Sequence, residues 1–249
     1  MLSLRVLLFI ASLIFIIILN VIDQAKSNEY RIVETITGAI RGRRNVTLLK
    51  EVPFYSFKGI PYAQPPIGEL RFKAPKPVES WKPNVLDAFD FGDMCTQPLL
   101  LLPSSFPQSE ICLTLNIYVP DSDVKSKLAV LFFIHGGGYT EGSYHDSIFG
   151  PDFIVEKETI LVTINYRLGA FGFLSLDSPE YSGNMGLKDQ QLALKWIHAN
   201  IGRFGGDNKR ITVFGQSAGG SATNYHMLSA ESRKYFRNGI LMSGSAFNY

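Results

Sequence analysis

The sequence predicts an α/β fold with a central, mostly parallel sheet. Four short runs are rich in apolar residues, as strands buried on both faces of a sheet should be. They are residues 127–136, 159–167, 210–215 and 238–246. Residues 186–204 and 218–230 lie between them and have the character of helices. Buried strands that alternate with helices predict one sheet with helices on both faces.

Residues 1–25 have the pattern of a secretory signal peptide. Arg5 precedes an apolar run over residues 6–22, and the small residues Ala25 and Ser27 follow it. The alternative is an uncleaved signal anchor, because the run approaches the roughly 20 residues that span a bilayer. We expect a secreted protein that keeps no membrane span after cleavage.

Residues 28–249 are expected to belong to one domain, because no internal repeat or low-complexity tract divides them. Residues 30–57 show the partial alternation of short strands. Residues 59–83 are rich in proline and glycine but interleaved with apolar residues, which indicates an ordered irregular segment. Residues 86–110 are predicted to form a loop, and residues 113–120 form a further strand.

The charge balance argues against nucleic acid as a partner. Lys and Arg number 24 and Asp and Glu 22, for a net charge of +2. The densest basic cluster is residues 41–44, which has too few charges to follow a phosphate backbone and is typical of a solvated hairpin edge. No cluster of His, Cys and carboxylate residues suggests a metal ligand set, so we expect no metal and no cofactor.

Cys95 and Cys112 are the two cysteines of the chain. In an oxidising compartment an even count predicts a disulfide, and two free buried thiols are the alternative. Asn45 begins the single Asn-x-Ser/Thr sequence and is a predicted glycosylation site on an exposed hairpin.

The segment Gly215-Gln216-Ser217-Ala218-Gly219 lies where a buried strand ends and a helix begins. This context predicts a nucleophile elbow, a tight turn that exposes a serine hydroxyl above a sheet. Glycines at both ends remove side chains that would collide with neighbouring backbone. The serine also lies at a helix N-terminus, which favours developing negative charge. The alternative is an ordinary helix N-cap.

The segment His135-Gly136-Gly137-Gly138 follows an earlier buried strand. Three glycines allow backbone N–H groups to turn toward one point, where they can donate to the oxygen of a tetrahedral intermediate. A flexible glycine-rich loop and a phosphate cradle are the other interpretations. A cradle is disfavoured because neither Gly-Lys-Ser/Thr nor a helix follows.

These motifs resemble the type-B carboxylesterase and cholinesterase family of α/β-hydrolases. Matching stretches extend from Val33 to Ser245. They are KGIPYAQPPIGELRF, SEICLTLNIYVP, FIHGGGY, VTINYRLGAFGFL, GNMGLKDQQLALKWIHANIGRFGGD, ITVFGQSAGG and ILMSGSA. The resemblance implies an α/β-hydrolase fold and the hydrolysis of carboxylic esters through an acyl-enzyme.

The resemblance also implies roles for individual residues. Ser217 is the expected nucleophile, and Gly137, Gly138 and Ala218 are the expected oxyanion donors. Cys95 and Cys112 are expected to form the first disulfide of the family.

Two positions depart from the family pattern. Ile111 stands where an acidic residue usually precedes the second cysteine, which is expected to weaken an ion pair near the disulfide. Gln216 stands where most members have Glu before the serine, as in insect juvenile hormone esterases and some related insect carboxylesterases. A neutral amide lowers the negative field near the serine, so we expect a neutral, lipophilic ester rather than a choline ester.

In α/β-hydrolases the acid and the histidine of the triad follow the serine. Only 32 residues follow Ser217, so the resemblance implies that both lie beyond Tyr249. The chain is then expected to be an N-terminal half, truncated after the strand that follows the elbow, and inactive by itself. The histidines already present are disfavoured as the base, because none follows the serine on a later strand end. They are His135, His145, His198 and His226.

A different class of function remains as an alternative. The same fold is used by secreted or cell-surface proteins that bind or adhere without catalysis. The intact serine and the intact glycine loop favour the hydrolase.

Overall fold

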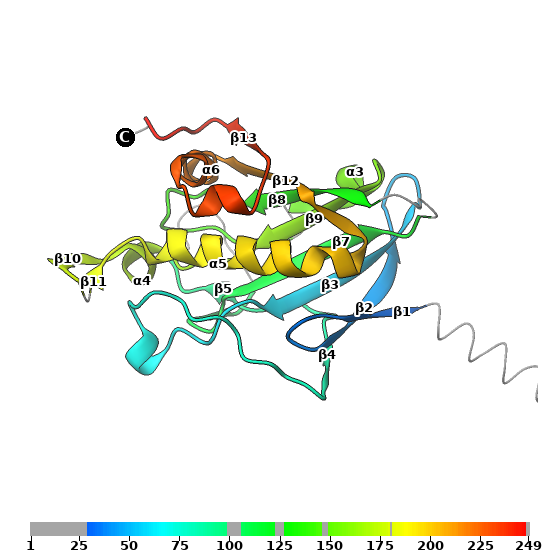
Figure 1. The fold of residues 1–249 in the computed structure, drawn as a ribbon, viewed down its shortest axis with the longest axis horizontal. Coiled ribbons are helices and arrows are strands. Elements are labelled where there is room, and N and C mark those ends of the chain that lie inside the picture. The colour runs from blue at the N-terminus through cyan, green and yellow to red at the C-terminus, as the bar shows by residue number, and fades with distance from the viewer. Residues whose placement is uncertain (1–28, 99–105, 123–126, 146–148, 180, 248–249) are drawn as a thin grey trace, which may run out of the picture.

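The computed structural model describes residues 29–98, 106–122, 127–145, 149–179 and 181–247. The described residues form one large sheet with helices packed on its faces (Figure 1). Its strands are β1 (Tyr30–Glu34), β2 (Ala39–Val46), β3 (Pro53–Pro61), β4 (Val85–Asp87), β7 (Thr114–Pro120), β8 (Leu128–Ile134), β9 (Thr159–Ile164), β12 (Gly206–Gln216) and β13 (Asn238–Met242). Their order is β1-β2-β3-β7-β9-β8-β12-β13, and β4 pairs with β2.

The sheet is mixed in direction. Strands β9, β8, β12 and β13 pair in parallel, whereas β1, β2, β3 and β7 pair antiparallel, as does β7 with β9. The expectation of a mostly parallel sheet therefore holds for the half that contains β8, β12 and β13. The N-terminal strands differ because short loops join β1 to β2 and β2 to β3, and a parallel pair needs a long crossover connection.

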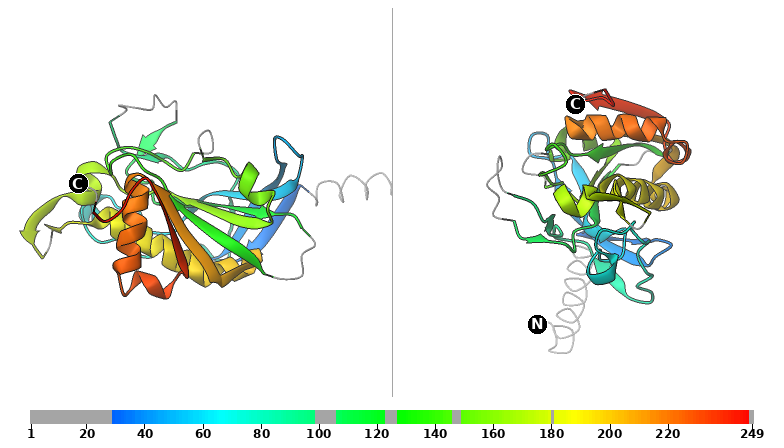
Figure 2. Two further views of the ribbon diagram at one scale, coloured as in Figure 1. Left: turned by 90° about the horizontal axis from the view of Figure 1, so that it is seen from above. Right: turned by 90° about the vertical axis from the view of Figure 1, so that its left-hand side faces the viewer.

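Helices cover the two faces of the sheet unequally (Figure 2). The helices α5 (Met185–Asn200) and α6 (Ala218–Leu228) lie on one face, where side chains such as Ile134, Leu194 and Ala222 belong to the main core. The short helix α3 (Asp152–Val155) packs on the opposite face against a smaller cluster that includes Phe133. Alternation along each strand sends neighbouring side chains to opposite faces, so both faces are apolar.

The sequence patterns did not predict several short helices, turns and strands. They are α4 (Gly169–Phe173), the strand pair β10 (Ser175–Ser178) and β11 (Tyr181–Ser182), the strand pair β5 (Met94–Cys95) and β6 (Gln108–Ser109), and the 3-10 turns η1 (Gly68–Leu70), η2 (Ile201–Phe204) and η3 (Ser232–Lys234). Each is shorter than the window over which periodicity can be detected. The predicted signal peptide at residues 1–25 lies outside the described residues and stays a prediction.

Candidate active site

Ser217 lies between the end of β12 and the start of α6, as the elbow motif predicts. Its backbone has φ 56° and ψ −123°, a conformation that residues with a side chain rarely adopt. Its N–H donates to the carbonyl oxygen of Met242 at 2.8 Å. Met242 ends β13, which runs parallel to β12, so this hydrogen bond ties the strained turn to the neighbouring strand. Ser217 is half-exposed.

The two glycines of the motif are required by close backbone packing. A Cβ added at Gly215 would overlap the backbone of Gly219, and a Cβ at Gly219 would overlap the carbonyl oxygen of Ile134. No rotamer change relieves a clash with backbone. The tight turn around Ser217 therefore depends on hydrogen at both positions.

The parallel register of β8 and β12 brings the glycine-rich loop to Ser217. Gly215 pairs with Ile134, so the residues that follow these two leave the sheet at the same edge. A Cβ added at Gly136 would lie 3.1 Å from Cβ of Ser217. Two motifs separated by about eighty residues in the chain thus meet at one point.

The backbone N–H groups of Gly137, Gly138 and Ala218 donate to no partner among the described residues. Gly137 and Gly138 have φ angles of 105° and 61°, which turn this segment back on itself. The carbonyl oxygen of Gly137 instead accepts the N–H groups of Thr140 and Glu141, both at 3.0 Å. Backbone hydrogen bonds within the loop thus close it, and the N–H groups of Gly137 and Gly138 take no part in them.

The sequence of this chain matches the carboxylesterase family over residues 29–249. The chain belongs to the carboxylesterase family. The mixed sheet with its strand–turn–helix at Ser217 is accordingly an α/β-hydrolase fold.

Particular carboxylesterases are similar over much of this chain. It is 47% identical to a juvenile hormone esterase of Tribolium castaneum over 78% of its length and 42% identical to esterase B1 of Culex pipiens over 87%. These alignments cover 33% and 40% of the two relatives. A solved juvenile hormone esterase from Manduca sexta, with OTFP covalently attached, superposes with a TM-score of 0.82 at 42% identity, covering 88% of this chain and 42% of that one. The chain therefore spans well under half the length of these relatives.

Three buried histidines of this carboxylesterase chain are bonded to groups other than Ser217. The Nδ1 atom of His135 lies 2.8 Å from the Gly136 carbonyl oxygen, and that of His145 lies 2.9 Å from Ser143 Oγ. The ring of His226 lies between Ser232 and Gln190. Burial lowers the pKa of His135 and of His226 to about 4, so both rings are neutral.

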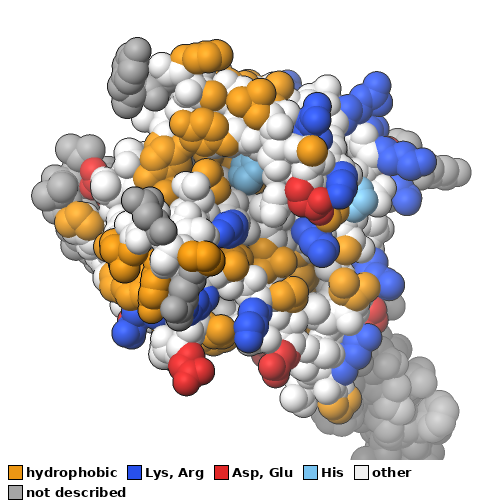
Figure 3. Space-filling view, turned by 60° about the vertical axis from the view of Figure 1, so that its left-hand side comes forward, with side chains coloured by type: hydrophobic (Ala, Val, Ile, Leu, Met, Phe, Trp, Pro, Cys, Tyr) orange, Lys and Arg blue, Asp and Glu red, His pale blue; other side chains and the backbone are white. Residues whose placement is uncertain are grey.

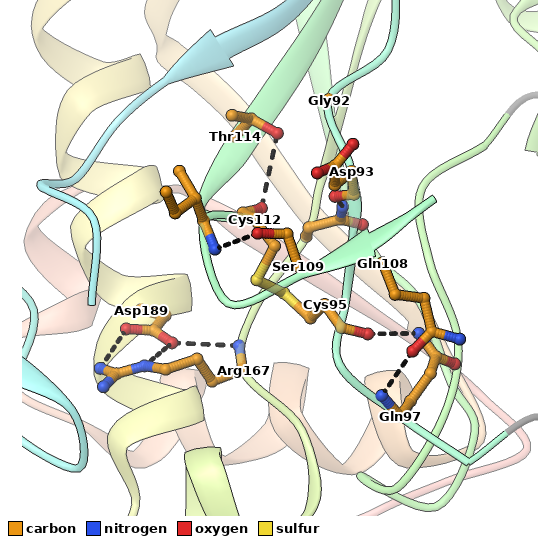
Figure 4. The surroundings of a disulfide bond; sticks show 12 residues. Gly92, Asp93, Cys95, Gln97, Gln108, Ser109, Cys112, Thr114, Arg167 and Asp189 are labelled. Carbon is orange, nitrogen blue, oxygen red and sulfur yellow. Dashed lines mark hydrogen bonds and ion pairs between the residues drawn. A yellow bond between two sulfur atoms is a disulfide. The ribbon is translucent and has the colours of Figure 1, made fainter. Parts of the chain in front are cut away.

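The expected disulfide joins Cys95 to Cys112 (Figure 4). The expectation that Ile111 weakens an ion pair beside it is wrong. Glu110, one position earlier, accepts two hydrogen bonds from Arg71, at 2.6 and 2.7 Å. The carboxylate that pairs with Arg71 therefore lies two positions before Cys112 and not one. The sequence pattern did not identify Arg71 as the partner of Glu110.

Asn45, the predicted glycosylation site, lies near the end of β2 and is half-buried. Its Nδ2 donates to the carbonyl oxygen of Arg43 at 3.0 Å and to Ser56 Oγ at 2.8 Å. Thr47, the third residue of the sequon, is buried and donates to Glu156 at 2.9 Å. The sequon is therefore more ordered than the exposed hairpin that we expected.

An apolar cavity lies beside Gln216, the residue before Ser217. Gln216 borders a cavity of about 240 Å³ whose walls include Phe133, Leu161, Phe214 and Met242. Hydrophobic side chains also gather on the side of the molecule toward which the parallel strands run (Figure 3). Among the described residues no helix is long and apolar enough to cross a membrane.

Sequence reasoning missed Gln97, Arg167 and Asp189. Gln97 bonds the backbone of Gly142 in the glycine-rich loop. Arg167 and Asp189 form a buried ion pair close to the disulfide (Figure 4). Each contact joins residues far apart in sequence, and isolated polar residues give no periodic signal.

Proposed function

We propose that Ser217 is the nucleophile of a carboxylic ester hydrolase and that Gly137, Gly138 and Ala218 bind the oxyanion. The arrangement of three N–H groups without described partners beside a serine on a strained turn supports this most directly. Donors held in place before the reaction stabilise negative charge without reorganising, and one such donor contributes about 3 kcal/mol to transition-state stabilisation.

The reaction proceeds in two halves. The Ser217 oxygen attacks the ester carbonyl carbon, its proton passes to a base, and the carbonyl oxygen becomes the oxyanion. The tetrahedral intermediate collapses, and the alcohol leaves with that proton. Water then attacks the acyl-serine, and the carboxylic acid leaves as the serine hydroxyl is restored. The related Manduca sexta esterase, with its covalently attached OTFP, supports covalent chemistry at this fold.

The triad acid and histidine are proposed to come from sequence beyond Tyr249 in a longer protein. The buried histidines of this chain are bonded elsewhere, and relatives are more than twice as long as the aligned segment. Sequencing the transcript past the codon for Tyr249 tests this. An open frame with an acidic residue and then a histidine in family context is expected. A stop codon at that point contradicts the proposal and predicts no turnover.

The nucleophile is tested on the longest chain that the transcript encodes. A neutral p-nitrophenyl ester should be hydrolysed, and Ser217→Ala should lower kcat by about 10⁴-fold or more. A fluorophosphonate probe should add its mass to the parent and not to the variant. Turnover that survives Ser217→Ala excludes this serine. A complete chain without turnover or labelling favours the binding or adhesion function instead.

The proposed substrate is a neutral, lipophilic ester. The amide of Gln216 adds no charge next to Ser217 in the chain, and the cavity that Gln216 borders is lined mainly by apolar side chains. Gln216→Glu should raise kcat/KM for a choline ester relative to a neutral ester of the same acyl group, because a carboxylate attracts the cation. An unchanged ratio contradicts this role of Gln216.

We also propose that the protein is secreted, after cleavage of the signal peptide, and glycosylated at Asn45. The disulfide supports an oxidising compartment. A glycan leaves one N–H on Nδ2, so one of the two Asn45 hydrogen bonds must be lost. Protein from the medium of secreting cells should lose mass with peptide N-glycosidase, and Asn45→Gln should abolish that loss.

A further inference from the structure

The side chain of Gln97 and the backbone of Gly142 bind each other at two points. The Gly142 N–H donates to Oε1 of Gln97 at 2.6 Å, and Nε2 of Gln97 donates to the Gly142 carbonyl oxygen at 2.9 Å. The amide thus uses its donor and its acceptor at once on a single residue. Such a reciprocal pair fixes both the position and the orientation of a backbone segment.

Gln97 is itself held next to the disulfide. Its Nε2 also donates to the carbonyl oxygen of Cys95 at 2.9 Å, and its backbone N–H donates to Oε1 of Gln108 at 2.9 Å (Figure 4). The strands β5 and β6, which contain Cys95 and Gln108, pair with each other in parallel. The disulfide between Cys95 and Cys112 cross-links the chain two residues before Gln97, which restricts the movement of the Gln97 backbone.

Gly142 lies directly against the loop that contains the proposed oxyanion donors. A Cβ added at Gly142 would overlap the ring of His135 and would lie 2.5 Å from the carbonyl oxygen of Gly136. The residue before it, Glu141, donates its N–H to the carbonyl oxygen of Gly137 at 3.0 Å. Movement at Gly142 must therefore displace the segment that presents Gly137.

The other end of the loop is held independently. The ring of His135 stacks on Tyr166 with 4.4 Å between centroids, and the Tyr166 hydroxyl donates to the His135 carbonyl oxygen at 2.9 Å. β8 anchors this end in the sheet. The loop therefore has one end fixed by the sheet, while Gln97 makes two side-chain hydrogen bonds to the other end.

We propose that Gln97 is a positioning residue for the oxyanion hole. It fixes the Gly142 end of the loop so that the N–H groups of Gly137 and Gly138 stay beside Ser217. The inference rests on the proposed function, because an oxyanion hole contributes to the rate only when its donors are held in place before the reaction. The disulfide restricts the backbone near Gln97, and the Gln97 side chain in turn holds the glycine-rich loop through Gly142.

Hydrogen exchange of the 249-residue chain tests the hold on the loop without any catalysis. Gln97→Met keeps the length of the side chain but removes the donor and the acceptor. The hydrogen-bonded amides of Thr140, Glu141 and Gly142 should then exchange about tenfold faster, because the two hydrogen bonds between Gln97 and Gly142 are lost. Gln191→Met is the matched control, because it removes one amide bond to Ser232 away from the loop, and it should leave these amides unchanged. Equal exchange in the two variants overturns the proposal.

Gln97→Glu provides a second variant in case Gln97→Met does not fold. A carboxylate still accepts the Gly142 N–H but cannot donate to the Gly142 carbonyl oxygen. An increase in exchange at Thr140, Glu141 and Gly142, with the rest of the chain unaffected, supports the two-point hold. Exchange as slow as in the parent overturns it.

Kinetics of the longest encoded chain test the catalytic consequence. Gln97→Met should lower kcat by about tenfold or more with KM little changed, because the loop acts in the transition state. A raised KM with unchanged kcat, or unchanged kinetics despite faster exchange, overturns the positioning role. A parent without any turnover overturns the proposed function and this catalytic role together, whereas the exchange experiment still decides whether Gln97 holds the loop.

Discussion

The guanidinium of Arg167 and the carboxylate of Asp189 form a two-point ion pair inside the protein, with N···O distances of 2.8 and 2.7 Å. The same carboxylate accepts the backbone N–H of Arg167 at 3.1 Å. Side-chain exposure is 4% for the arginine and 0% for the aspartate. The pair joins the segment after β9 to α5, close to the disulfide (Figure 4).

Asp189→Ala should lower the free energy of unfolding by about 3–5 kcal/mol, because it leaves a buried guanidinium without its counter-charge. Urea unfolding measures the loss. Asp87→Ala, which removes the partner of the exposed Arg41 pair, is the control and should cost far less. Equal losses in the two variants contradict the role assigned to burial.

Removing the disulfide with Cys95→Ser and Cys112→Ser together should destabilise the chain by about 3 kcal/mol. The cross-link spans a sequence separation of 17 and restricts the unfolded chain. Urea unfolding of the double variant, compared with the oxidised parent, gives the difference. The parent under dithiothreitol should match the double variant, and a parent insensitive to reduction would contradict the prediction.

Stability should fall as the pH is lowered from about 6.5 to about 4. Burial lowers the pKa of His135 and of His226 from 6.5 to about 4, so the unfolded chain binds more protons in this interval. The contribution of the two neutral rings to the free energy of unfolding is fully present above pH 6.5 and is lost as the pH falls to about 4. The loss is up to about 3 kcal/mol for each ring. Urea unfolding at several pH values measures the slope. His226→Gln should reduce that slope, and an unchanged slope would exclude His226 as a source.

Gly219→Ala should destabilise the protein by about 1–3 kcal/mol or more, because its Cβ would overlap the backbone oxygen of Ile134. Gly202→Ala is the matched control, since a Cβ there meets nothing within 4 Å. Thermal unfolding of both variants provides the comparison. A similar midpoint for both would show that the elbow tolerates a side chain at position 219.

The chain expressed by itself is predicted to self-associate. β13 leaves Ile240 48% and Met242 37% exposed, and among the described strands it pairs with β12 alone. Apolar edge strands are templates for pairing with further strands. Light scattering after gel filtration should show species larger than a monomer, and Ile240→Lys should reduce them. A soluble monomer at high concentration would refute the prediction.

Local patterns in the sequence were sufficient to predict the strand, turn and helix around Ser217 and the glycine-rich loop after β8. These features depend on backbone conformation within a few residues, which glycine and apolar spacing make visible. The pairing of Cys95 with Cys112 followed from there being two cysteines.

Other features were decided by the tertiary structure. The antiparallel pairing of β7 with β9, the burial of His226 and the ion pair of Arg71 with Glu110 had no signal in the sequence. Gln97 and Gly142 are 45 residues apart, and they meet only after the sheet has assembled. The physical reason is that such contacts depend on which surfaces pack together, and a polar residue seen alone in the sequence does not indicate its distant partner.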